Sequence, residues 1–70
     1  MFATEDRNGS SHRIRIDRIS AYYTFQPPSH SEWVLSVILF GANTPYQIEF
    51  DDYNSAVSAF DKLNKHFECE

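Results

Sequence analysis

Three histidines and one cysteine are the side chains in this sequence best suited to bind a transition metal. His66 and Cys69 lie three positions apart, a spacing that places both on one side of a helix. A structural zinc site needs four ligands, however, and neither His12 nor His30 has a neighbour that completes such a set. We therefore expect no metal and no other cofactor, and we interpret the histidines as surface residues.

Asp51 and Asp52 form an adjacent carboxylate pair, and paired carboxylates can serve general acid–base catalysis. At a strand-to-helix junction they are better explained as helix caps, because either carboxylate can accept hydrogen bonds from free backbone amides. The only glycines are Gly9 and Gly41, which make no phosphate-binding loop, and no serine sits in a nucleophile elbow. We expect a protein that is not an enzyme and has no small-molecule substrate.

Arginines gather in the first part of the chain, where Arg13, Arg15 and Arg18 could contact phosphates. They support a nucleic-acid-binding module as the alternative function. The charge of the whole chain disfavours nucleic-acid binding, because ten acidic side chains outnumber six basic ones and the net charge is −4. The same negative balance disfavours binding to the negative surface of a cytoplasmic membrane leaflet.

The elements that must position these residues begin after a polar segment. Residues 1–12 contain Asn8-Gly9-Ser10-Ser11, and we expect a flexible tail, followed by a single small domain over residues 13–70. From residue 13 to 25 apolar side chains alternate, at even positions up to Ile16 and at odd positions from Ile19. A β-bulge near Asp17–Arg18 would restore the register of one long strand; alternatively, the two halves face different surfaces.

Two further strands and a helix are predicted after a loop at residues 26–32. Residues 33–40 are apolar on both faces, as in a central strand, and residues 46–50 alternate as in an edge strand. From Asp51 or Asp52 onward, apolar residues recur every three or four positions, which predicts an amphipathic helix. The predicted fold is α+β: a three-stranded antiparallel β-meander, followed by one C-terminal helix packed on one sheet face (β-β-β-α).

One helix cannot cover both faces of that sheet, and the sequence does not decide which face of the central strand meets it. The apolar residues left over are candidates for an interface: Tyr22, Val34, Ile38 and Phe40. We expect a protein–protein interaction module, with a second copy or another protein on the open face. The alternative is that the first strand and the Pro27-Pro28 loop cover this face.

Three strands followed by a helix is also the architecture of plant AP2-type and phage-integrase arm-type DNA-binding domains. Trp33, the turn at Gly41 and Ala56 are similar in outline to that pattern. The resemblance implies a sheet that enters the major groove, with arginines and aromatic side chains contacting bases. The chain departs from it at residues 43–45, which carry no lysine, in the exposed Glu49, and in a helix that begins with two aspartates.

A single cysteine cannot form an internal disulfide, which suits a reducing compartment. The sequence begins without the basic and apolar regions of a secretory signal, and no apolar run approaches the roughly 18 residues of a membrane span. We expect a cytoplasmic protein with no membrane segment.

Overall fold

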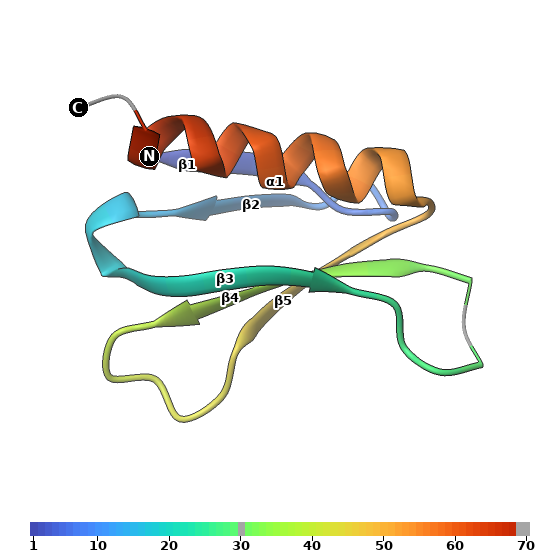
Figure 1. The fold of residues 1–70 in the computed structure, drawn as a ribbon, viewed down its shortest axis with the longest axis horizontal. Coiled ribbons are helices and arrows are strands. Elements are labelled where there is room, and N and C mark those ends of the chain that lie inside the picture. The colour runs from blue at the N-terminus through green and yellow to red at the C-terminus, as the bar shows by residue number, and fades with distance from the viewer. Residues whose placement is uncertain (30, 69–70) are drawn as a thin grey trace.

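Five strands and one α-helix form within residues 1–29 and 31–68, the part of the chain that the computed structural model describes (Figure 1). The elements are β1 (Phe2–Glu5), β2 (Ser11–Ile14), β3 (Ile19–Phe25), β4 (Trp33–Leu39), β5 (Tyr46–Phe50) and α1 (Tyr53–Glu68). The predicted α+β class, with a C-terminal helix packed on an antiparallel sheet, is confirmed. The described residues form two antiparallel sheets, however, β1-β2 and β3-β4-β5.

The three-stranded sheet is the meander that the alternation predicts. β4 lies between β3 and β5 because its side chains are apolar on both faces, and Leu35 of β4 pairs with Ile48 of β5. Val37 pairs with Tyr22 of β3. The alternation within the sheet then assigns every side chain of β4 to one face or the other.

The prediction of a flexible tail over residues 1–12 is wrong. β1 pairs with β2 in register, and Phe2 lies opposite Ile14. Both side chains are buried, Phe2 with no exposed surface at all. A five-residue turn closes this hairpin, and Gly9 adopts the left-handed conformation (φ 83°) that glycine tolerates best. The buried aromatic ring anchors the N-terminus in the core.

The long strand predicted from residue 13 to 25 is two strands in different sheets. A turn of 3-10 helix over Ile16–Arg18 separates them, where the sequence predicts a bulge at Asp17–Arg18. A shift of register does occur farther along, between Ile19 and Ala21 of β3. The change from even to odd apolar positions therefore has two structural causes. The 3-10 turn separates two strands, and the pairing of β3 with β4 shifts in register between Ile19 and Ala21.

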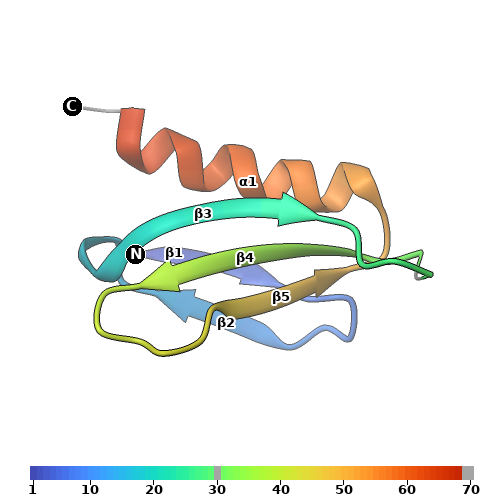
Figure 2. The ribbon, with the colours of Figure 1, turned by 60° about the horizontal axis from the view of Figure 1, so that its bottom comes forward.

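The helix and the N-terminal hairpin lie on the same face of the three-stranded sheet (Figure 2). Leu35 and Val37 of β4 form one buried cluster with Phe2 of the hairpin and with Ala56 and Leu63 of α1. The odd-numbered face of β4 is thus the covered one. No helix in the described part of the chain is both long and apolar enough to cross a membrane.

The helix begins where the sequence places its cap. Oδ1 of Asp52 accepts a hydrogen bond from the amide of Ser55 at 2.8 Å. This bond satisfies one of the free amides of the first turn and lowers the pKa of the Asp52 carboxyl. Of the two predicted candidates, Asp52 is therefore the cap, and Asp51 instead pairs with Nε of Arg7 at 3.2 Å.

Candidate functional site

The second face of the three-stranded sheet has no element packed on it among the described residues, as Figure 2 shows. We call this surface the open face. The side chains that alternation places on it are Ala21, Tyr23 and Phe25 of β3, Val34, Ser36 and Ile38 of β4, and Gln47 and Glu49 of β5. The N-terminal hairpin does cover a face of the sheet, as the sequence allowed, but it shares the face that the helix covers.

The open face is apolar and partly exposed. Tyr23 is 45% exposed and Ile38 37%, and Phe40, two positions after Ile38, is 59% exposed. Val34 and Ser36 are buried between the side chains of the flanking strands. Oγ of Ser36 is buried and has no hydrogen-bond partner among the described residues. Glu49 is the one charged residue among the eight that make up this surface.

Two of the four predicted interface residues, Val34 and Ile38, lie on this side of β4, and Phe40 follows directly after the strand, in the turn. Tyr22 does not belong to this side. Tyr22 lies on the helix-facing side, stacks on Phe67 with ring centroids 5.5 Å apart, and donates a hydrogen bond to Oδ1 of Asn64. The register shift after Ile19 is the reason, because it reverses which positions of β3 face the helix.

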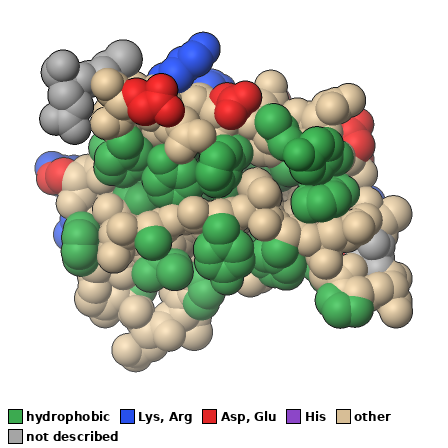
Figure 3. Space-filling model, in the orientation of Figure 1, with side chains coloured by type: hydrophobic (Ala, Val, Ile, Leu, Met, Phe, Trp, Pro, Cys, Tyr) green, Lys and Arg blue, Asp and Glu red, His purple; other side chains and the backbone are tan. Residues whose placement is uncertain are grey.

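Hydrophobic side chains gather in two bands on either side of β3 (Figure 3). On the side of the sheet that α1 covers, Tyr22 stacks on Phe67 and Trp33 contacts Tyr53, with ring centroids 4.8 Å apart. The other band belongs to the open face. Charged side chains lie at the margins of this view, so the middle of the surface is apolar.

A hydrogen-bonded chain of three side chains joins the N-terminal hairpin to β5. Nε2 of His12 lies 2.9 Å from Oδ2 of Asp6, and Nδ1 lies 2.6 Å from the hydroxyl of Tyr46. Because a carboxylate only accepts, Nε2 carries the proton, and in the neutral ring Nδ1 accepts from the phenol. The order resembles an acid–base relay. Tyr46 does not line the adjoining groove, however, so the chain acts as a link between two sheets.

The Asp6 carboxyl is held ionised by this arrangement. The hydrogen bond from His12 is the main cause that lowers its pKa below the ordinary 3.8, and the amides of Ser10 and Asn8 act in the same direction. The cluster could not be predicted from the sequence, because Tyr46 lies 34 residues from His12 and Asp6 was assigned to a flexible tail. Only the pairing of β1 with β2 and the docking of the hairpin bring them together.

Acid should therefore destabilise the hairpin through Asp6. A carboxyl whose pKa is lowered by folding contributes stability above its unfolded value of 3.8, and this contribution is lost as the pH falls through the lower folded value. We expect Asp6→Asn to be less stable than wild type at pH 6 and to lose less stability between pH 6 and pH 2. Urea denaturation at both pH values measures this. Asp17→Asn, which removes an exposed pair with Arg15, is the control and should follow wild type; an equal acid response in Asp6→Asn would contradict the assignment.

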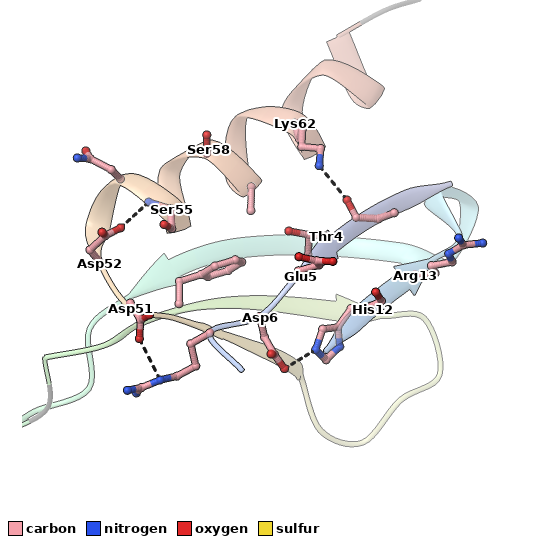
Figure 4. A pocket seen from close by; sticks show the side chains of 16 residues that line it. Thr4, Glu5, Asp6, His12, Arg13, Asp51, Asp52, Ser55, Ser58 and Lys62 are labelled. Atoms are coloured by element: carbon pink, nitrogen blue, oxygen red, sulfur yellow. Dashed lines mark hydrogen bonds and ion pairs between the residues drawn. The ribbon is translucent and has the colours of Figure 1, made fainter. Parts of the chain in front are cut away.

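An open groove of about 880 Å³ runs between the hairpin and the first half of α1 (Figure 4). Its walls are β1 on one side and a helical stripe of Ser55, Ser58 and Lys62 on the other. Nζ of Lys62 donates to the carbonyl oxygen of Ala3 at 3.1 Å. The groove is polar, in contrast to the open face.

The three arginines proposed as nucleic-acid contacts do not occupy one strand. Arg13 belongs to β2 and lines the groove, whereas Arg15 and Arg18 belong to the segment around the 3-10 turn. Arg15 is exposed and pairs with Asp17 at 3.2 Å, which offsets its charge. The arrangement brings no row of free cations to one strand face.

Within the described residues, no group of three His, Cys, Asp or Glu side chains is placed to hold a metal ion. His30 and Cys69, and with Cys69 the spacing from His66, lie outside the described residues. No protein-family model matches the chain, and the searches of curated proteins and of solved structures gave no significant match.

Proposed function

We propose that the protein is a small, non-enzymatic interaction module of the cytoplasm that forms a homodimer, in which the open faces of two copies pack against each other. The observation that carries the proposal is that only one face of the three-stranded sheet is covered by other elements. The helix and the hairpin both lie on one face of the sheet, and the opposite, apolar face is left without a covering element in the described chain.

Leaving this face exposed to solvent forgoes stabilisation, and a small domain has little stability to spare. Full burial of a large apolar side chain stabilises by about 1.5–3 kcal/mol, and Tyr23, Ile38 and Phe40 each retain a third or more of their exposure. A domain of this length buries only about 60% of its unfolded surface. A second copy is always present at the concentration of the first, and two-fold dimers are the commonest oligomers.

The charges at the ends of the open face favour a second copy over an unrelated partner. Glu49 lies beside Val34 at one end of β4, and Arg18, whose carbonyl accepts from the amide of Phe40, lies at the other. A two-fold axis between the faces and perpendicular to β4 reverses the strand direction. It places the Arg18 end of one copy over the Glu49 end of its partner, which is electrostatically complementary.

Ile38→Glu should convert the dimer to a monomer, because it places a carboxylate within the apolar contact, at the end of β4 that lies over Glu49 of the second copy. Sedimentation equilibrium from micromolar to millimolar protein measures the change, and we expect a shift of about tenfold or more in the dissociation constant. Phe67→Glu is the matched control, since Phe67 on α1 is 36% exposed against 37% for Ile38 and lies on the opposite layer. Its dimerisation should equal that of wild type.

A charge exchange tests the orientation of the two copies. Glu49→Arg alone should weaken the dimer, and Arg18→Glu with Glu49→Arg in the same chain should restore it. A wild-type protein that stays monomeric to millimolar concentration would remove the homodimer and leave a different protein as the partner of this face. Equal weakening by Phe67→Glu and Ile38→Glu would place the interface elsewhere.

A further inference from the structure

The outer edge of β3 carries backbone groups that no other strand of the described chain uses. β3 is the end strand of its sheet and pairs with β4 alone. In an antiparallel pair, positions that exchange hydrogen bonds alternate with positions that point away from the partner strand. The carbonyl of Glu49 in β5 accepts from the amide of Arg7, outside the sheet, so its partner Val34 in β4 directs its backbone groups to β3.

The alternation along β3 follows from its register with β4. Phe25 pairs with Val34 and directs its backbone groups inward, to β4, as does Tyr23 two residues earlier. Tyr22 and Thr24 therefore direct theirs outward. Among residues 1–29 and 31–68, no hydrogen bond reaches these outward groups. The two residues lie roughly 6.8 Å apart, the repeat with which an added strand forms its hydrogen bonds.

β3 also lacks the features that protect strand edges. Natural edge strands are often short, or they carry charged residues or proline. β3 has seven residues, Ile19–Phe25, and none of them is charged or a proline. Its register shift lies at the beginning, between Ile19 and Ala21, so the part from Tyr22 onward pairs regularly. An edge of this kind is a template for another extended chain.

Hydrophobic side chains flank this edge on both sides. Figure 1 looks onto β3 with β4 behind it, and Figure 3 shows, in the same orientation, a hydrophobic band on either side of β3. On the helix side, the ring of Tyr22 lies 5.2 Å from that of Phe60 and 5.5 Å from that of Phe67. On the other side, the exposed Tyr23 lies 5.9 Å from Phe25.

A strand added here needs no space between packed elements. It continues the plane of the sheet beside β3, whereas α1 lies over one face of that sheet. Its side chains alternate between the two faces and so pack on both hydrophobic bands. Addition of an extended segment to a free sheet edge is a common mode of peptide recognition.

The charges on α1 beside the edge favour a basic partner. Asn64 accepts a hydrogen bond from Tyr22, so this side of α1 borders β3. Asp61, three positions earlier, and Glu68, four positions later, lie on the same side of the helix. Both are exposed, and neither forms an ion pair within the described part of the chain. A basic side chain on the added strand is complementary to them.

The same carboxylates disfavour a second copy at this edge. Two-fold pairing of β3 with β3 of another copy would bring the two α1 helices side by side on one face of the joined sheet. Asp61 and Glu68 of both helices would then approach one another, and like charges brought together weaken binding.

We infer that the outer edge of β3 binds an extended, basic segment of another protein as an added strand, antiparallel as are the other pairs of this sheet. The segment exchanges backbone hydrogen bonds with Tyr22 and Thr24. Its residue opposite Tyr22 is a lysine or arginine, whose stem lies on Phe67 and whose charge meets Glu68 and Asp61. The site is separate from the homodimer contact, which uses the open face, and it gives the interaction module a class of partner.

The probe is the capped peptide acetyl-Thr-Val-Ile-Lys-Thr-amide, in which Val lies opposite Thr24 and Lys opposite Tyr22. Amide hydrogen exchange of 15N-labelled protein is measured by NMR as the peptide is added. With peptide at about ten times its dissociation constant, exchange at Tyr22 and Thr24 should slow about tenfold, because only the unbound fraction exchanges.

Three modified peptides separate the backbone contribution from the charge. N-methylation of the Val amide, which donates to β3, should weaken binding about tenfold. N-methylation of the Ile amide is the matched control, because that amide points away from β3, and binding should not change. Replacement of the Lys by Glu should weaken binding about tenfold.

Variants of the protein test the same contacts from the other side. Asp61→Lys with Glu68→Lys should remove the preference for the lysine peptide over the glutamate peptide. Glu5→Lys makes the same kind of charge change on β1, beside the groove, and should keep the preference of wild type. Ile38→Glu should bind the peptide as wild type does, so that failure of the homodimer and failure of this site are distinguishable.

Three results would overturn the inference. The first is peptide-independent exchange at Tyr22 and Thr24, or slowed exchange along β5 or β1 in their place, which would put the peptide on another edge. The second is equal binding of the two N-methylated peptides or of the lysine and glutamate peptides. The third is exchange at Tyr22 and Thr24 that slows with protein concentration alone, which would make a second copy the occupant.

Discussion

Phe2→Ala should lower the free energy of unfolding by about 3–5 kcal/mol, the usual cost when a fully buried phenylalanine is truncated. Phe2 has no exposed surface and packs in the same cluster as Leu35 and Leu63, although it is the second residue of the chain. Small domains have only about 5–15 kcal/mol of stability in total. The variant should therefore be close to unfolded at 37 °C.

Urea denaturation followed by the fluorescence of Trp33, the single tryptophan, measures this loss, because Trp33 packs against the core cluster. Met1→Ala is the matched control, since Met1 is adjacent and 67% exposed. It should change stability by no more than about 0.5 kcal/mol. A loss below about 1 kcal/mol in Phe2→Ala would mean that the hairpin contributes little and that residues 1–12 behave as a tail after all.

The strand and the helix with regular apolar spacing could be predicted from the sequence, whereas this hairpin could not. The strand at residues 33–39 and the helix at residues 53–68 follow from apolar spacing within single segments, and the structure confirms both. β1 and β2 have only four residues each and little periodicity. Phe2 becomes a core residue because β1 pairs with β2, opposite Ile14, and because the hairpin packs on the sheet. Local patterns in the sequence do not predict contacts of this kind between separate segments.

The candidate surface was predictable to the extent that β4 specifies it. A strand that is apolar on both faces must leave one face uncovered by a single helix, so the sequence predicts an open face but leaves undecided whether it is the side of Val34, Ile38 and Phe40 or the side of Trp33. Tyr22 was misplaced because its face depends on the register shift between Ile19 and Ala21, which alternation alone does not locate. A switch of the apolar side chains from even to odd positions is compatible with a β-bulge within one strand, with two separate strands, or with both.

The groove beside β1 was beyond sequence reasoning for a different reason. Its walls come from segments some fifty residues apart, as the bond between Lys62 and Ala3 demonstrates. Seven of the sixteen residues that line it belong to residues 1–12, the segment predicted to be a flexible tail. The groove exists only once the hairpin has formed, since β1 supplies one of its walls.

Leu35→Ala and Ile38→Ala should differ sharply, although both truncate an aliphatic side chain of β4. Leu35 is fully buried on the covered face, and its truncation should cost about 2–5 kcal/mol at every protein concentration. Ile38 is 37% exposed on the open face, and in dilute, monomeric protein its truncation should cost about 1 kcal/mol. Urea denaturation of both variants at low micromolar concentration measures the difference.

The dependence of stability on protein concentration then shows whether Ile38 lies on an exposed surface or in a dimer interface. Partner binding stabilises only the folded state, so a wild-type homodimer gains stability as protein concentration rises. The cost of Ile38→Ala should grow over the same range, because the truncated side chain lies in the contact, while the cost of Leu35→Ala relative to wild type should stay constant. A cost for Ile38→Ala that equals that for Leu35→Ala in dilute protein would mean that the open face is already covered within one chain. A cost that remains near 1 kcal/mol up to millimolar protein would mean that two copies do not meet through Ile38.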